Sequence, residues 1–264
     1  MNEPLLDVRD IGISFGGLRA VADFSLQVPR NSLYGLIGPN GAGKTTIFNL
    51  LTGVYRPGRG SIHLRGQRID GRKPYEIAQA GLSRTFQNVR LFGELSVLDN
   101  LRVACHMHTP RHGLLATLLR TRGYRQQEKR MLDKVMALLS IFKLEQFQNM
   151  QAKNLAYGNQ RRLEILRAIA TDASLILLDE PAAGLNPAEK ESLADAIRQI
   201  RDQFNLTILL IEHDMRLVMK ICECITVLDH GEVIARGCAT EIQTDPNVIE
   251  AYLGDPGTPP TSTD

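Results

Sequence analysis

Gly38-Pro39-Asn40-Gly41-Ala42-Gly43-Lys44-Thr45 is the stretch that decides the fold. It has the spacing Gly-x-x-x-x-Gly-Lys-Thr and lies between the apolar run 32–37, which is typical of a buried strand, and the apolar stretch 47–51, which begins a helix. Its glycines let the backbone approach a polyphosphate, and successive amides with the helix N-terminus supply positive potential. We therefore predict a nucleotide-binding loop, with Lys44 reaching the terminal phosphates and Thr45 ligating Mg²⁺.

Acidic residues follow a second buried strand, predicted at 175–178. That run ends at Asp179 and Glu180, and a third apolar run, 207–211, ends at Glu212 and His213. Open α/β sheets bind ligands at the carboxyl ends of their strands. Combined with the loop at 38–45, Asp179 is predicted to hold Mg²⁺ through water and Glu180 to orient or deprotonate the hydrolytic water.

Alternating strands and helices organise most of the chain. The segment 21–28 alternates like a half-buried strand, and 225–228 with 232–235 predicts a hairpin around a glycine-containing turn. Between the runs at 175 and 207, Asn186, Pro187 and Glu189 mark the start of a helix that is expected to end at about Phe204. These elements favour an α/β fold.

The middle of the chain has a different pattern. From about 97 to 150 the buried-strand runs disappear, and apolar residues at helical spacing predict core positions: Met131, Val135, Leu138, Leu139 and Phe142. We expect a helical subdomain inserted into the α/β body. Its basic residues are better explained by a solvated helix face than by an RNA or lipid surface: Arg111, Arg120, Arg122, Arg125, Lys129 and Arg130. His106, His108 and His112 are expected in an exposed loop rather than in a metal site.

Composition excludes several classes of protein. With 264 residues and 43% hydrophobic residues, the chain has a globular composition and can bury a core. Its net charge of +2 (31 basic against 29 acidic residues) is too small to imply nucleic-acid binding. No apolar run reaches the roughly 20 residues of a spanning helix, and the N-terminus lacks a signal sequence, so we expect a cytoplasmic protein. The four cysteines are expected to be reduced, with Cys222 and Cys224 serving as small core residues rather than metal ligands.

A further segment resembles a known family. Leu155-Ala-Tyr-Gly-Asn-Gln-Arg-Arg162 is similar to the signature loop of ABC-type ATPases, and the other motifs occur in that family's order from about Leu5 to Leu253. Gln87 resembles the glutamine that couples nucleotide to the membrane partner, residues 183–186 resemble the D-loop, and His213 resembles the switch histidine that holds the γ-phosphate. Phe15 is placed like the aromatic residue that stacks on adenine.

The resemblance implies a fold and a set of site residues. The fold is α/β, a P-loop NTPase of the ABC type with a RecA-like core, an antiparallel β subdomain and an inserted helical subdomain at roughly 97–165. The ATPase domain would occupy 1–254, and 255–264 would be a disordered tail. The catalytic residues would be Glu180, His213 and Gln87, and the metal ligands Thr45, Gln87 and Asp179. ATP would be bound by Phe15, Gly38, Asn40, Gly41, Ala42, Gly43, Lys44, Thr45 and Thr46, and in trans by Ala156, Tyr157 and Gly158 of the partner chain.

One residue departs from the family pattern. Family members commonly have serine as the second signature residue, which donates to the γ-phosphate held by the opposite subunit, and this chain has Ala156. A neutral hydrogen bond is worth about 1 kcal/mol, so we expect a weakened but working site.

Several segments resemble the branched-chain amino acid uptake group: the signature segment, 181–187, 211–215 and 245–254. This implies an ATP-hydrolysing subunit of a membrane ABC importer, with ATP and Mg²⁺ as cofactors. Its partners would be two transmembrane permeases, a second ATPase subunit or a second copy of itself, and indirectly an extracytoplasmic substrate-binding protein, with no nucleic acid. It would lie peripherally on the cytoplasmic face of the inner membrane.

Three alternatives stay open. The same machine could carry urea, short amides or lipopolysaccharide. A soluble ABC ATPase of translation or DNA repair would usually have two nucleotide domains, long coiled coils or zinc modules, which this sequence lacks. A nucleotide-binding regulator without turnover is disfavoured by Glu180 and His213.

Overall fold

Two β-sheets form the body of the protein, and this computed structural model describes residues 3–106 and 121–253. The larger sheet has six strands in the order β10-β9-β3-β8-β7-β6, and its pairs are parallel except for β9 with β10. The strands are β3 (Leu33–Ile37), β6 (Leu82–Arg84), β7 (Leu175–Asp179), β8 (Thr207–Ile211), β9 (Cys224–Asp229) and β10 (Glu232–Gly237). The predicted strands at 32–37, 175–178 and 207–211 and the hairpin at 225–235 are confirmed.

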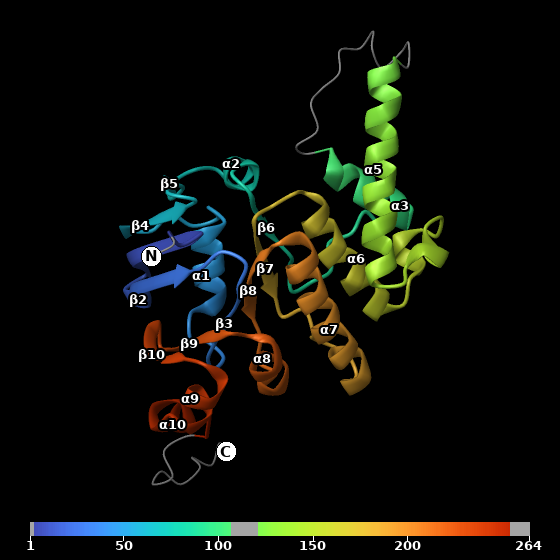
Figure 1. The fold of residues 1–264 in the computed structure, drawn as a ribbon. Coiled ribbons are helices and arrows are strands. Elements are labelled where there is room, and N and C mark those ends of the chain that lie inside the picture. The colour runs from blue at the N-terminus through green and yellow to red at the C-terminus, as the bar shows by residue number, and fades with distance from the viewer. Residues whose placement is uncertain (1–2, 107–120, 254–264) are drawn as a thin grey trace.

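The smaller sheet is antiparallel, in the order β2-β1-β4-β5. It consists of β1 (Leu6–Phe15), β2 (Leu18–Val28), β4 (Arg59–Leu64) and β5 (Gln67–Arg68). In Figure 1 it lies on the opposite side of helix α1 (Lys44–Leu51) from α6 (Tyr157–Ala170) and α7 (Pro187–Phe204). The predicted α/β class with an antiparallel β part is therefore confirmed.

The helices follow their local start and stop signals. In α7, Asn186 Oδ1 accepts from the Glu189 amide at 2.9 Å and Glu189 Oε2 accepts from the Asn186 amide at 3.0 Å, which is the predicted capping box. The helix ends where Asn205 takes a left-handed conformation, φ 51°. The remaining helices are α2 (Pro74–Gln79), α3 (Val97–Cys105), α5 (Arg122–Ile141), α8 (Met215–Ile221), α9 (Ala239–Thr244), α10 (Pro246–Leu253) and the short η1 (Glu145–Phe147) and η2 (Ala152–Asn154).

Two hydrophobic clusters pack against strand β3, one on each of its faces. Leu33 and Ile37 belong to the cluster that includes the helical part of the chain, whereas Tyr34 and Leu36 belong to the cluster under the antiparallel sheet. Since successive side chains of a strand point to opposite faces, β3 is buried on both. The loop that follows β3 is thus held between the two halves of the molecule.

The helical part contains α3, α5 and α6, and α5 stands at the far side of the molecule from the antiparallel sheet (Figure 1). The predicted apolar stripe is buried in its core: Met131, Val135, Leu138, Leu139 and Phe142. The limits of this subdomain, like the boundary at 254, stay predictions. The predictions for Arg111, Arg120, His108, His112 and the tail at 255–264 fall outside the described residues.

Four smaller findings concern membrane crossing, the cysteines and metal ligands. In the two described ranges, no helix combines the length and apolar character needed to cross a membrane. Cys222 is buried in the core against Gly35, as predicted, and this burial raises the pKa of its thiol to about 12. Cys224 is half-buried. Within the same ranges, no three histidine, cysteine or acidic side chains are grouped as metal ligands.

Candidate functional site

The glycines of the loop at 38–43 are required by its close packing. Gly38 has φ 152°, and a Cβ there would lie 2.1 Å from the Leu228 carbonyl oxygen of β9. Gly43, at φ 101°, precedes α1, and its Cβ would lie 2.8 Å from the Ala20 carbonyl oxygen of β2. Neither position has room for a side chain. The loop is therefore packed between β9 and β2, and it leads directly into α1.

Lys44 occupies the interior of this loop. Its Nζ donates to the carbonyl oxygens of Gly38 at 2.7 Å and Pro39 at 2.8 Å, and the residue is only 8% exposed. Burial lowers the pKa of Lys44, while the nearby charges of Glu180 and Asp179 oppose that shift. The ammonium group is thus held inside the loop, at the position predicted for the phosphates of a nucleotide. Thr45, in the first turn of α1, is exposed.

Two of the predicted catalytic residues, Gln87 and His213, approach one carboxylate oxygen of the third, Glu180. Glu180 follows β7 in a left-handed conformation, φ 48°, and its amide donates to the Ile211 carbonyl at 2.9 Å. Gln87 Nε2 donates to Glu180 Oε2 at 3.0 Å, and His213 Nδ1 lies 3.7 Å from the same oxygen. The side chain of His213 is 59% exposed, whereas that of Glu180 is 20% exposed. The structure therefore brings together residues that are 93 and 33 positions apart in the sequence.

Asp179 has a partner that the sequence analysis missed. Arg84 Nη2 donates to Asp179 Oδ2 at 2.7 Å, and Arg84 Nη1 donates to Asn49 Oδ1 at 2.7 Å. The side chain of Arg84 is 8% exposed and that of Asp179 is 6% exposed. Thr85 Oγ1 also accepts from the Asp179 amide at 3.2 Å. The sequence offered little signal for this pair, because β6 is only the three residues Leu82-Ser83-Arg84 and has no apolar run that would mark it as a strand.

The signature segment packs on the loop that follows Glu180. Ala156 is the N-cap of α6 and supplies no side-chain cap. A Cβ on Gly184 would lie 3.0 Å from Tyr157 Cε1, and one on Gly158 would lie 3.0 Å from Glu189 Oε1. Tyr157 is 46% exposed. These contacts place Tyr157 and Gly158 beside residues 184–189. The predicted role of Ala156, Tyr157 and Gly158 toward a partner's nucleotide stays a prediction.

Phe15 stands at the end of β1 with 44% of its surface exposed. Its ring meets that of Tyr55 edge to face, with centroids 5.1 Å apart. The partial exposure of this aromatic residue is compatible with the predicted contact with adenine, which stays a prediction.

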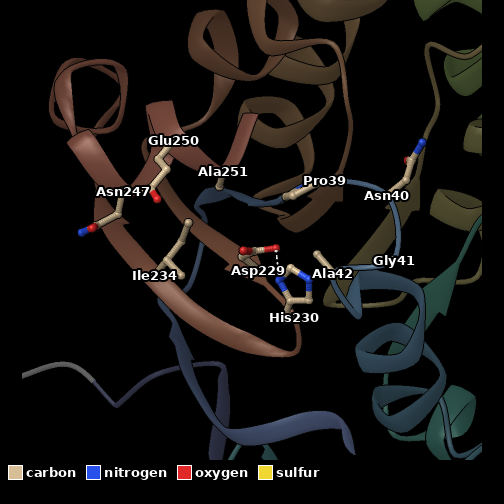
Figure 2. Close-up of a pocket in the computed structure, with 10 residues that line it drawn as sticks. All are labelled: Pro39, Asn40, Gly41, Ala42, Asp229, His230, Ile234, Asn247, Glu250 and Ala251. Carbon is tan, nitrogen blue, oxygen red and sulfur yellow. Dashed lines mark ion pairs between the residues drawn. The ribbon is translucent and has the colours of Figure 1, made fainter. Parts of the chain in front are cut away.

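A cavity of about 820 Å³ borders the outer edge of the loop. Figure 2 shows residues 39–42 on one side of it and α10 on the other, with the ion-paired Asp229 and His230 between them, Nδ1 to Oδ1 2.8 Å. Burial raises the pKa of Tyr252 in α10 to about 12, and the Gly38 backbone partly opposes this shift. The C-terminal helix thus packs beside the first glycine of the loop.

The donor atoms of the predicted metal site fit Mg²⁺. Thr45 offers a hydroxyl oxygen, Gln87 an amide oxygen and Asp179 a carboxylate, and Mg²⁺ prefers oxygen ligands with few carboxylates and substrate phosphates. Arg84 uses Oδ2 of Asp179, which leaves Oδ1 for a metal-bound water. The set therefore suits a magnesium ion that enters together with a nucleotide.

Comparisons with known proteins agree with this geometry. The family model described as "ABC transporter" matches residues 21–183, and one described as "Branched-chain amino acid ATP-binding cassette transporter" matches 232–258. The high-affinity branched-chain amino acid transport ATP-binding protein LivG of Salmonella typhimurium is 48% identical, covering 97% of this chain and all of that protein. BraF of Pseudomonas aeruginosa, described in the same words, is 46% identical over the same shares. The solved ADP conformation of MJ1267, an ATP-binding cassette of an ABC transporter, superposes with a TM-score of 0.81 at 28% identity, covering 96% of this chain and all of that one.

Proposed function

The chain belongs to the ABC transporter ATP-binding family, and from this premise we propose that it hydrolyses ATP to power a membrane importer of branched-chain amino acids. The single observation that supports turnover is the contact of Gln87 and His213 with one oxygen of Glu180. The amino-acid cargo is supported by relatives of 46–48% identity that span nearly the whole chain, and by the second family model at 232–258.

The proposed mechanism assigns one task to each side chain. The amides of the loop and Lys44 hold the phosphates of ATP. Glu180 accepts a proton from the attacking water while the oxygen of that water bonds to the γ-phosphorus. The bond to the bridging oxygen breaks and ADP keeps that oxygen. Gln87 and His213 orient Glu180 Oε2, and His213 is exposed enough to contact the γ-phosphate. Magnesium, held by Thr45, Gln87 and Asp179, would supply positive charge for the phosphate oxygens.

The partners follow from the same assignment. The relatives are ATP-binding subunits of transporters, so we propose that this chain docks under two permease subunits at the cytoplasmic face of the inner membrane. A second ATPase chain, or a second copy of this one, would present its own Ala156, Tyr157 and Gly158 to the nucleotide. The partial exposure of Tyr157 supports that contact. An extracytoplasmic binding protein would deliver the amino acid to the permeases.

Glu180→Gln tests the hydrolytic assignment. We expect hydrolysis to fall by at least about 10²-fold, because general-base catalysis contributes roughly 10²–10⁴-fold. ATP binding, measured by equilibrium titration, should persist because Lys44 and the loop are unchanged. Glu191→Gln, on the exposed face of α7, is the matched control and should hydrolyse ATP normally. Retained turnover in Glu180→Gln would remove Glu180 from this role.

The cargo is tested with the trapped complex. Tagged Glu180→Gln protein is held with ATP, recovered from detergent-solubilised membranes, and its partners are identified by mass spectrometry. We expect two permeases and an accompanying binding protein that binds leucine, isoleucine or valine in a titration. A binding protein selective for urea or an amide would replace the cargo assignment, and exclusively soluble partners would overturn the transport function.

A further inference from the structure

Helix α6 carries a buried ion pair that none of the proposed catalytic steps uses. Arg161 Nη1 and Glu164 Oε2 are 3.3 Å apart, and each side chain is 3% exposed. Withdrawing two charges from water is costly, and the mutual attraction compensates only when the remaining donors and acceptors also find partners. The position of those partners therefore indicates what the pair is for.

Their partners lie in the loop that carries Gln87. Arg161 Nη1 donates to the Phe86 carbonyl at 2.7 Å and Nη2 donates to the Gln87 carbonyl. Glu164 Oε1 accepts from the amides of Phe86 at 3.3 Å and Arg90 at 3.2 Å. The ion pair thus fixes the backbone on both sides of the Gln87 side chain, whose amide reaches Glu180 at 3.0 Å.

The third nitrogen of Arg161 points the other way along α6. Nε donates to the Tyr157 hydroxyl at 3.1 Å, and the guanidinium carbon lies 5.6 Å from the centroid of the Tyr157 ring. The same ring covers Gly184, four residues after Glu180. One buried guanidinium therefore contacts both the signature segment and the loop of Gln87.

We propose that Arg161 is a positioning residue that couples the Tyr157 loop to Gln87. When a ligand or partner chain moves Tyr157, Arg161 transmits the displacement to the Gln87 backbone, and the contact between Gln87 and Glu180 changes. The inference rests on the proposed function and adds a route by which the signature segment regulates hydrolysis. It predicts coupling between residues that do not touch, whereas a purely structural ion pair predicts independent effects.

A double-mutant cycle on ATP turnover distinguishes coupling through Arg161 from a purely structural ion pair. Tyr157→Phe removes only the hydroxyl that accepts from Arg161, and Gln87→Ala removes the last link to Glu180. We expect Tyr157→Phe alone to lower kcat about three- to tenfold, the equivalent of one modest hydrogen bond. In the Gln87→Ala background the same change should alter kcat less than about twofold, because the route is already interrupted. Tyr75→Phe, at a 58% exposed tyrosine on α2, is the control and should leave kcat unchanged in both backgrounds. An equal loss from Tyr157→Phe in both backgrounds, or no loss in either, overturns the proposal.

Amide hydrogen exchange tests the same route without turnover. In the full chain, Arg161→Lys keeps a charge beside Glu164 but cannot bond to Phe86, Gln87 and Tyr157 together. Exchange of residues 86–90 should accelerate about tenfold in that variant and measurably in Tyr157→Phe, with β7 and β8 unchanged. Unchanged exchange at 86–90 in Tyr157→Phe overturns the coupling even if the variant hydrolyses ATP. Conversely, absence of ATP turnover in the unmodified protein, with the exchange response intact, refutes the proposed function and not the mechanical link.

Discussion

Arg84 lies outside the recognised motifs, and its buried charge is paired with a residue of the site. It is buried against Asp179 and reaches Asn49 in α1, so it joins the helix after the phosphate loop to the strand that ends in Asp179, the proposed metal ligand. Its guanidinium also lies 5.4 Å from the ring centroid of Phe48 and 5.3 Å from that of Phe86. Removing one partner of such a pair leaves an uncompensated buried charge.

We expect Arg84→Met to lower the free energy of unfolding by about 3–5 kcal/mol. Urea denaturation measures this change. The double variant Arg84→Met/Asp179→Leu should recover much of the loss, because no unpaired charge remains. Arg59→Met, which breaks the exposed pair with Asp23, is the control and should cost no more than about 1 kcal/mol. Equal losses of stability in Arg84→Met and Arg59→Met would show that the buried pair contributes no more to stability than the exposed one.

Gly184 and Gly123 give a second prediction at the scale of single residues. Gly184 has φ 77°, and an added Cβ would lie 3.0 Å from the Tyr157 ring, so Gly184→Ala should destabilise the protein by about 1–3 kcal/mol. Gly123 lies in the first turn of helix α5, and an added Cβ meets no described atom within 4 Å, so Gly123→Ala should stabilise by about 0.4–1 kcal/mol because alanine restricts the unfolded chain. Thermal unfolding of both variants is the measurement. Shifts of the same sign would contradict the prediction.

At the scale of elements, Glu212 links the end of β8 to the loop after Glu180. It is fully buried, and its carboxylate accepts from the amides of Ala182 at 2.8 Å and His213 at 3.2 Å. Burial raises the pKa of Glu212, although these amides and the charge of His213 oppose the shift. A raised pKa means that the folded protein holds this proton more tightly than the unfolded chain does.

The pH dependence of Glu212→Gln follows from that difference. The contribution of Glu212 to stability is complete below its unfolded pKa, near 4.5, and is lost as the pH rises through the higher folded pKa. The glutamine variant lacks this loss. Its stability deficit relative to the unmodified protein should therefore shrink between pH 5 and pH 8 when urea midpoints are compared. A deficit that is constant or grows with pH would contradict the assignment.

The elements also show what a sequence pattern can predict. The strand, loop and helix at 33–51 and the capped helix α7 were predictable because their signals are local: an apolar run, glycines, and Asn186 with Glu189 three residues later. The pairs Arg84 with Asp179 and Arg161 with Phe86 join residues 95 and 75 positions apart. A hydrophobic pattern does not indicate which arginine contacts which distant residue, so these pairs could be identified only from the structure.

At the scale of the whole molecule, the site lies where two hydrophobic clusters meet. The phosphate loop follows β3, which is buried by both clusters, whereas Gln87 is held by α6 of the helical part and Glu180 by the central sheet. Under the proposed coupling, a change in the position of the helical part would alter the contact between Gln87 and Glu180. The signature segment lies on the same helix, α6.

The last prediction concerns Ala156 and the association of two chains. Ala156 caps α6 without a side-chain hydrogen bond, so Ala156→Ser should stabilise the monomer by about 1 kcal/mol through the new cap. If the segment also faces a partner's nucleotide, the serine hydroxyl adds a donor to the γ-phosphate and ATP-driven dimerisation should strengthen about five- to tenfold. Sedimentation with ATP measures the second effect as the difference between the Glu180→Gln/Ala156→Ser protein and the Glu180→Gln protein. Both proteins without nucleotide are the control, because a cap alone stabilises monomer and dimer equally. A rise in thermal stability with unchanged dimerisation would mean that Ala156 caps a helix and does not meet the nucleotide of a second chain.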